Sequence, residues 1–429
     1  MSGSFDAERH LRLAGERQLL DAGRRATTLP LQLGEIAGAL VAVQALDEEV
    51  AREIVEDYGT ALALRGGGGL PVVARPRLQA SGPAGPPTAA RIAACDAVVD
   101  VGGSKVTVLF ASLRPDSAAL AVVWSLDPGP GGGFGPTMRR HMVRGAGVPG
   151  VRLTDDRGTT RLAGFSGGGS PAKQRGELRT DQPLAVNTEW IEVDGHRVAL
   201  VDRPPPARVA LETLQGSSPA EAHLWSRLAS GRHGPHGGPF PPHVDVAIET
   251  LVAAGALEPD DPLVGEVRAV LGAFSGQPLQ GAVREPWQSL LASHWRAATR
   301  SCVVPAGVVT PAIGGVTVAL DAVVLAEGEM EVHVRTSDPP GHPWVADVIP
   351  VGPRLVWWAE DELGNHYLGA PSRWSGGPQG ASGVVSFWPS VDDRVRRLRL
   401  TPTAGRERAV VDVALPDKGV ALYGKEGDR

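Results

Sequence analysis

Residues 7–11 read AERHL and residues 220–224 read AEAHL, and three more pairs of similar stretches follow in the same order. The pairs are LVAVQAL at 40–46 with LVAAGAL at 251–257, VTVL at 106–109 with VTVA at 316–319, and DDRG at 155–158 with DELG at 361–364. Their spacing stays between 206 and 213 residues. A composition rich in Ala, Leu and Val produces single matches by chance, but it does not explain a shared order and spacing that includes Asp and Gly. The sequence therefore predicts an internal duplication.

Each predicted copy consists of a helical segment followed by a β-rich segment. We expect an α+β fold in which a small helical bundle precedes an Ig-like antiparallel β-sandwich, and in which this unit occurs twice. The expected boundaries are 1–66 for the first helical segment, 67–94 for a Gly/Pro-rich linker, 95–203 for the first Ig-like domain, 204–216 for a Pro-rich linker, 217–299 for the second helical segment, 300–416 for the second Ig-like domain and 417–429 for a polar tail.

Capping residues and apolar spacing place the helices. Asp47 can cap a helix in which Val50, Ile54, Tyr58 and Leu62 recur every four positions and form one apolar face. Residues 218–221 read SPAE, which is a capping box with proline at the first helical position. The expected helices cover about 4–25, 31–43, 48–65, 244–254, 262–274 and 286–299, with one more starting at 219.

The β segments show the alternation of half-buried strands. Met330, Val332 and Val334 alternate with polar side chains. Several short strands with turn signals in about 110 residues are typical of an immunoglobulin-sized sandwich. The Cys…Trp…Cys pattern of antibody domains does not occur in the sequence, so we do not expect an antibody-type domain.

Three motifs follow one another in the second β segment: WWAEDELGNHY at 357–367, VVSFWP at 384–389 and LRL at 398–400. Together they resemble the Ig-like β-sandwich of some bacterial anti-sigma-like and stress-associated proteins, where a D-x-x-G-N-x-Y turn precedes an F-x-P strand end and an L-x-L strand. The resemblance covers about a quarter of the chain and implies a fold used for protein contact, without catalytic residues. The sequence lacks the membrane helix and the Cys/His zinc-binding head of that family. The whole chain resembles actinobacterial proteins.

Length and composition exclude several classes of protein. With 429 residues, 42% of them hydrophobic, the chain can build more than one core. A net charge of −6 and a pI near 6.0 argue against a dedicated nucleic-acid binder. The polar N-terminal sequence has no secretory signal, and no run of 18 apolar residues occurs, so we expect a cytoplasmic protein without membrane contact.

Tryptophan supplies the best candidate for a binding site. Five of the ten Trp residues lie in the last β segment, and Trp357, Trp358, Trp374 and Trp388 are the candidate binding residues. Adjacent Trp357 and Trp358 point to opposite faces of a strand. We therefore expect at least one of them outside the sandwich core, covered by the helical segment or by a partner. The alternative is that these side chains only pack the core and its edges.

Potential metal ligands and thiols are few. His233, His236 and His243 are the densest candidate ligands, but they lie in a Gly/Pro-rich stretch, so we expect an exposed loop and no metal. Cys95 and Cys302 precede the two β segments at matching places. We expect buried apolar residues there, and a mutual disulfide is the alternative.

Two glycine motifs match known catalytic or cofactor patterns only formally. Residues 164–168 match G-x-S-x-G, but no helix can begin after them, which favours a hairpin loop over a nucleophile elbow. Residues 145–150 match G-x-G-x-x-G, but a β-like segment follows instead of the helix that would hold a pyrophosphate. We expect no cofactor.

These observations favour a non-catalytic cytoplasmic protein-interaction module, an adaptor or regulatory scaffold with a protein partner. The first alternative is a hydrolase-like enzyme with a site between a helical and a β segment, where polar groups such as Asp155, His141 or Asp361 would converge in a pocket. The second alternative is a carbohydrate-binding module that uses exposed Trp side chains.

Overall fold

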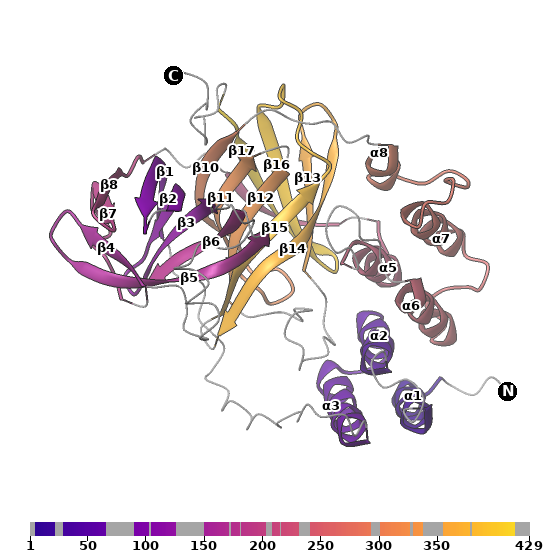
Figure 1. The fold of residues 1–429 in the computed structure, drawn as a ribbon. Helices are drawn as coiled ribbons and strands as arrows, with labels where there is room; N and C mark the ends of the chain where they lie inside the picture. The colour runs from indigo at the N-terminus through magenta and orange to yellow at the C-terminus, as the bar shows by residue number, and fades with distance from the viewer. Residues whose placement is uncertain are drawn as a thin grey trace, which may run out of the picture.

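The computed structural model describes residues 5–21, 29–65, 90–102, 104–125, 150–170, 173–180, 182–202, 208–214, 216–230, 241–292, 301–326, 329–337, 355–377 and 380–416. Within these ranges the chain forms helices and antiparallel strands (Figure 1). The helices are α1 (Ala7–Asp21), α2 (Leu29–Ala42), α3 (Glu48–Arg65), α5 (Pro219–Ser230), α6 (Pro241–Ala253), α7 (Pro262–Phe274) and α8 (Trp287–Ala292).

The first β unit follows α3 and the second follows α8. The first contains β1 (Arg91–Val101), β2 (Ser104–Leu113), β3 (Ala118–Ser125), β4 (Val151–Asp155), β5 (Thr160–Ser170), β6 (Lys173–Thr180), β7 (Trp190–Val193) and β8 (His196–Ala199). The second contains β10 (Cys302–Val309), β11 (Val318–Ala326), β12 (Glu329–Thr336), β13 (Leu355–Asp361), β14 (His366–Gly377), β15 (Gly380–Trp388), β16 (Arg397–Ala404) and β17 (Glu407–Ala414). The protein is thus an α+β protein with two large antiparallel β units.

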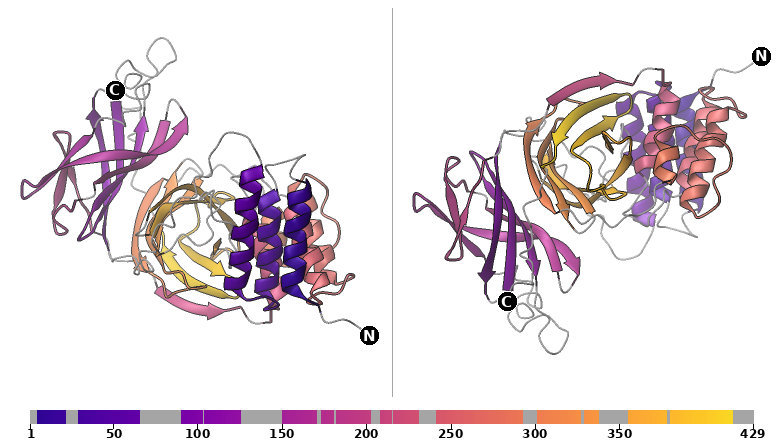
Figure 2. Two further views of the ribbon diagram at one scale, coloured as in Figure 1. Left: turned by 90° about the horizontal axis from the view of Figure 1, so that it is seen from below. Right: turned by 90° about the horizontal axis from the view of Figure 1, so that it is seen from above.

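The two β units have the same strand order. It is β1-β2-β3-β6-β5-β4-β7-β8 in the first unit and β10-β11-β12-β15-β14-β13-β16-β17 in the second. In the first unit, Ala94 and Val201 exchange two backbone hydrogen bonds of 3.0 Å, which join β1 to the segment after β8. Figure 2 shows the strands of the second unit around a ring.

The strand pairing differs from that of an Ig-like sandwich, whose two sheets do not share a ladder. Long strands join the sheets here. β5 pairs with β4 through residues 160–163 and with β6 through residues 164–170, and β14 bridges β13 and β15 in the same way. Each unit is therefore one continuous antiparallel sheet that bends around its own core.

Two expected linker boundaries need correction. β1 starts at Arg91, inside the expected linker 67–94. Residues 208–213 of the expected Pro-rich linker form β9 (Arg208–Thr213), which pairs antiparallel with β17. β9 covers the edge of β17 and satisfies its backbone hydrogen-bonding groups. The ion pair of Arg408 with Glu212, 2.5 Å, ties the added strand to its neighbour.

The helices, which we call the helical layer, lie together on one side of the second β unit, while the first β unit lies on the other side of that unit (Figure 2). α5 and α8 contact strands β13 and β14, respectively. α1, α2 and α3 share a small core around Leu11, Leu33 and Ile54. α2 also packs against α6, and Ala39 of α2 belongs to the core of the second set of helices. The helical segments of the two halves are therefore in direct contact. None of the described helices is long and apolar enough to cross a membrane.

The two β units meet through an apolar patch and a group of ion pairs. Phe110 packs its ring edge-on against His333, with ring centroids 4.9 Å apart, in a patch shared by β1, β2, β3, β10 and β11. Beside it, Arg335 binds Asp321 through two nitrogens at 2.9–3.1 Å, and Arg175 of the first unit reaches Glu331 at 3.0 Å. Of these contacts, the packing of Phe110 on His333 and the ion pair of Arg175 with Glu331 join the first unit to the second.

Candidate functional site

The β4–β5 and β13–β14 hairpins have the same construction, so their residues can be compared position by position. The carboxylate of Asp155 accepts backbone N–H groups two and four residues further on, at 3.0 and 2.8 Å. The carboxylate of Asp361 does the same at 2.8 and 3.0 Å. Gly158 and Gly364 follow with φ of 80° and 81°, a conformation that glycine adopts at little cost. Residues 206 positions apart are therefore equivalent in these hairpins.

The outer face of this hairpin in the second unit is covered by helices. Trp358 of β13 lies opposite Leu368 of β14, and Leu368 is 1% exposed. Both pack into the core of the helical layer, where Trp287 of α8 meets Trp358 edge-on with ring centroids 5.0 Å apart. The helices bury this face permanently within the chain.

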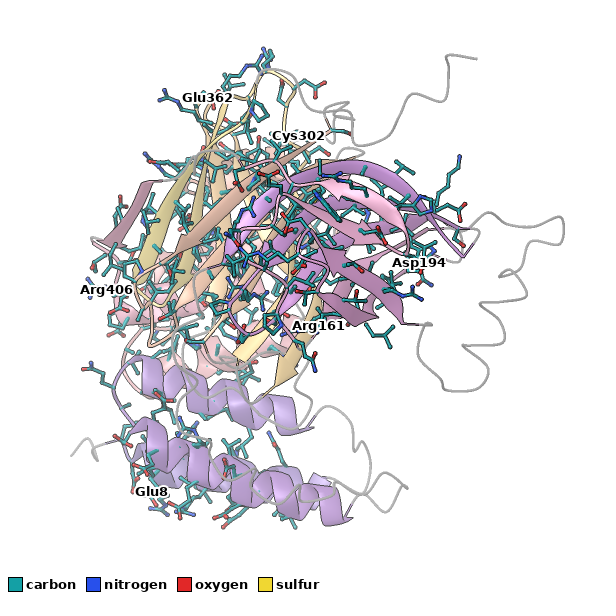
Figure 3. All side chains as sticks on the ribbon, turned by 90° about the vertical axis from the view of Figure 1, so that its left-hand side faces the viewer. Glu8, Arg161, Asp194, Cys302, Glu362 and Arg406 are labelled. Carbon is teal, nitrogen blue, oxygen red and sulfur yellow. The ribbon has the colours of Figure 1, made fainter. Side chains whose placement is uncertain are left out.

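The equivalent face in the first unit is open. Arg152 of β4 lies opposite Leu162 of β5, at the positions of Trp358 and Leu368, and the Leu162 side chain is 71% exposed. Figure 3 looks onto the first unit, and the helices lie below it rather than over it. Burial of the Leu162 side chain would therefore require a group from outside the described residues.

The same face continues over β7 and β8 with groups that are common in protein interfaces. Arg197 of β8 stacks on the half-buried ring of Trp190 in β7, with the guanidinium carbon 4.3 Å from the ring centroid. Trp and Arg are enriched among the residues that dominate binding energy. We define the open face as Arg152, Leu162, Trp190 and Arg197.

The Trp residues expected to bind a partner have other positions. Trp357 is 2% exposed in the core of the second β unit, so it cannot contact a partner in this fold. Trp358 and Trp388 are half-buried against the helical layer. The backbone of Trp374 lies in β14, and its side chain is outside the described residues. The opposite orientation of Trp357 and Trp358 is observed, and helices of the same chain cover Trp358.

Of the three expected metal ligands, the structure describes His243. His233, His236 and His141 lie outside the described residues, and His243 belongs to helix α6 rather than to a loop. Among the residues the structure describes, no three His, Cys, Asp or Glu side chains gather in a way that could hold a metal ion.

Asp155 and Asp361 stabilise turns and do not converge on a pocket. Burial alone would raise the pKa of Asp155, but backbone N–H groups of Ala185, Thr159 and Arg157 outweigh it and hold that pKa below its usual value. Tyr367 donates its hydroxyl to Asp361 at 2.6 Å. Both carboxylates are therefore engaged in hydrogen bonds within their own β units.

Cys95 and Cys302 are buried thiols. Burial raises the pKa of Cys95 to about 12, which keeps the thiol protonated and unreactive. Their expected equivalence is wrong, because both units have a β-bulge and the cysteines differ in position relative to it. Cys95 comes one residue after Ala94 at the first bulge, and Cys302 comes three residues before Pro305 at the second. The β2–β3 ladder has a bulge after Val108, and the β11–β12 ladder has one after Leu320. Aligning these two bulges makes residues 106–109 equivalent to 318–321, and not to 316–319 as the sequence match suggested.

The G-x-S-x-G motif lies within strand β5, not in a hairpin loop. Ser166 is exposed there on a regular strand. The glycines have a packing role: Gly167 faces Gly176 across the ladder, and the ring of Phe165 lies against both of them. The G-x-G-x-x-G stretch at 145–150 lies outside the described residues except for Gly150.

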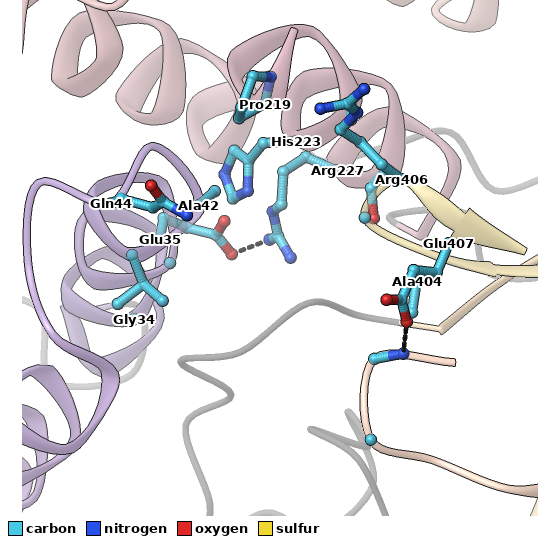
Figure 4. Close-up of a pocket in the computed structure, with 17 residues that line it drawn as sticks. Gly34, Glu35, Ala42, Gln44, Pro219, His223, Arg227, Ala404, Arg406 and Glu407 are labelled. Atoms are coloured by element: carbon cyan, nitrogen blue, oxygen red, sulfur yellow. Dashed lines mark hydrogen bonds and ion pairs between the residues drawn. The ribbon is translucent and has the colours of Figure 1, made fainter. Parts of the chain in front are cut away.

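A pocket of about 490 Å³ lies between α2, α5 and two turns of the second β unit (Figure 4). The helices contribute Glu35, His223 and Arg227 among others, and the turns contribute Gly314–Gly315 and Ala404–Glu407. It lies between helical and β segments, as the enzyme alternative required, but its polar residues are not the expected ones.

Glu35 and Arg227 form a buried ion pair at the floor of this pocket (Figure 4). Their side chains are 1% and 7% exposed, and they come from different halves of the chain. His243 Nδ1 lies 3.5 Å from the same Glu35 oxygen. One sequence signal could have indicated this pair: Glu35 is the only charged residue in the apolar helix α2.

Comparisons with known proteins identify no family. No family model matches the chain, and no curated protein does. Among solved structures, the chain is similar to a conserved domain protein from Bacillus anthracis at 11% identity, covering 75% of this chain and 90% of that one, with a TM-score of 0.19.

Proposed function

We propose that the protein is a non-catalytic interaction protein, an adaptor or regulatory scaffold, that binds a protein partner through the open face of its first β unit. We further propose that its halves derive from duplication of one unit made of helices and an antiparallel β unit. The shared strand order supports the duplication, as do the matching Asp155 and Asp361 turns. A cytoplasmic location is part of the proposal, since Cys95 and Cys302 are thiols.

One observation carries this proposal: the same face is covered in one unit and open in the other. Leu368 is 1% exposed under the helices, whereas the equivalent Leu162 is 71% exposed. Fully burying a leucine side chain contributes about 1.5–3 kcal/mol. A partner that covers Leu162 would gain a contribution of this size.

The partner we propose presents an amphipathic helix. Helices of this chain already cover the equivalent face of the second unit through Trp287 and its neighbours. Arg152 and Arg197 keep the open face soluble when it is unoccupied. Trp and Arg are both enriched in protein interfaces, and the two arginines make this face less apolar than a typical permanent interface.

A pair of surface variants tests this proposal. Leu162→Asp places a charge on the open face, and Leu20→Asp is the matched control, because Leu20 on α1 is 80% exposed. Tagged full-length wild type and both variants would capture proteins from the host lysate, followed by affinity measurement with the purified partner. We expect Leu162→Asp to weaken binding about 10- to 150-fold, and Leu20→Asp to leave it unchanged.

The opposite pattern would contradict the proposal. If wild type and Leu162→Asp capture the same proteins with equal affinity, the open face does not bind them. Circular dichroism of both variants shows whether the fold is retained, which we expect because both leucines are exposed.

A further inference from the structure

We propose that the pocket between α2, α5 and the second β unit binds a small organic carboxylate with an apolar body. This site is separate from the open face of the first β unit. It does not depend on the proposed function.

The size and walls of the pocket suit such a molecule. Its volume of about 490 Å³ falls within the range of small-molecule sites, about 300–1,000 Å³. Gly34 and Gly38 lie one turn apart on α2 and carry no side chains, which keeps the space between α2 and α5 open. Val41, Ala42 and Ala222 supply apolar wall.

The cationic groups on the pocket favour an anion. Arg227 stands at the floor and Arg406 at the rim, on the β16–β17 turn, and the first turns of α5 form one wall (Figure 4). The N-terminal end of a helix carries a partial positive charge. Arginine is well suited to carboxylates because its planar guanidinium can donate two parallel hydrogen bonds.

The acidic groups on the pocket are already engaged. Glu35 pairs with Arg227, with His243 Nδ1 3.5 Å away. Glu407 accepts the backbone N–H of Gly314 at 2.8 Å and so holds the turn at the mouth. Their negative charges are therefore partly compensated within the protein, while Arg406 is exposed at the entrance.

Two sources could supply this chemistry: a free small acid or the C-terminal carboxylate of a peptide. The test uses full-length protein and isothermal titration with two matched pairs of probes. Benzoate is compared with neutral benzamide, and N-acetyl-Ala-Ala-Ala with a free C-terminus is compared with the same peptide amide.

Two variants locate the binding. Arg406→Gln removes the exposed cation at the rim, and Arg9→Gln removes an exposed arginine of α1, outside the pocket and outside the open face, as a control. We expect benzoate to bind, benzamide to bind more weakly, and Arg406→Gln to lower benzoate affinity about two- to fivefold, as for an exposed ion contact. Arg9→Gln should leave benzoate affinity unchanged.

The outcomes separate clearly. If the peptide acid binds and benzoate does not, the pocket still binds a carboxylate, and the natural ligand is the C-terminus of a peptide. Benzamide binding as tightly as benzoate, no binding of either acid, or equal effects of the two variants would overturn the proposal. Gly38→Leu, which fills the pocket from α2, should abolish binding, and circular dichroism would confirm that this variant folds.

Discussion

The buried ion pair between Glu35 and Arg227 should be one of the strongest single links between the halves of the chain. Both side chains are at least nine-tenths buried, so neither charge has enough water to replace a lost partner. We expect Arg227→Met to destabilise the protein by about 3–5 kcal/mol, because it leaves the Glu35 carboxylate buried without its partner.

This free-energy change can be measured as a shift in melting temperature. If the helical layer and the second β unit unfold together, as a body of 150–250 residues would, each kcal/mol lowers Tm by about 2–4 °C. Arg227→Met should therefore lower Tm by about 6–20 °C in circular dichroism at neutral pH.

Removing both charges should recover most of this loss. The Glu35→Leu/Arg227→Met double variant should return to within about 1 kcal/mol of wild type, since apolar replacement of a buried pair is often neutral. The exposed pair of Glu48 and Arg52 on α3 is the control, and Glu48→Gln should cost less than about 0.5 kcal/mol. Two results would contradict this role of the ion pair: a Tm shift for Arg227→Met no larger than that for Glu48→Gln, or a double variant as unstable as Arg227→Met.

Three further outcomes follow from the described contacts. Gly167→Ala should lower Tm sharply, because its Cβ would overlap the backbone of the facing strand β6. Gly164→Ala is the control and should be tolerated, because no atom lies within 4 Å of its Cβ. Equal Tm values for the two variants would contradict this. Asp155→Asn should reduce stability at pH 7, because folding lowers the pKa of Asp155 and the ionised carboxylate therefore stabilises the fold. This stabilisation is fully present above the unfolded pKa of about 3.9 and is lost as the pH falls toward the folded pKa. The gap in Tm to wild type should therefore close in a pH series run below about 4, and a constant gap would count against it. Cys95 and Cys302 should react with a thiol reagent only after unfolding, and rapid labelling of the native protein would disprove their burial.

Much of the local structure could be predicted because its signals are local. α7 covers the expected residues 262–274, since Asp261 caps it and Pro262 begins it. Asp47 likewise caps α3, accepting the backbone N–H of Glu49 at 2.8 Å. Turn and cap chemistry depends on residues a few positions apart, so it can be read from sequence.

The strand order could not be predicted, because it depends on pairing between distant residues. Long strands such as β5 join what an Ig-like sandwich would keep as two sheets. The expected linker at 204–216 also gave no sign that residues 208–213 would add a strand to β17, two hundred residues later in the chain.

The candidate site was missed for a similar reason. Leu162 has nothing unusual in its sequence context, and its exposure becomes informative only through its equivalence to buried Leu368. Trp residues were the more conspicuous signal, but most of the described ones pack the second β unit and its helices. A conspicuous residue type is therefore a weaker guide than a difference between equivalent positions.

Hydrogen–deuterium exchange on the full-length protein, with and without its captured partner, tests the central proposal most directly. We expect the partner to slow exchange in the strands that carry the open face, β4, β5, β7 and β8, and to leave exchange in α1 and α3 unchanged. Protection confined to the helical layer or to the second β unit would contradict it.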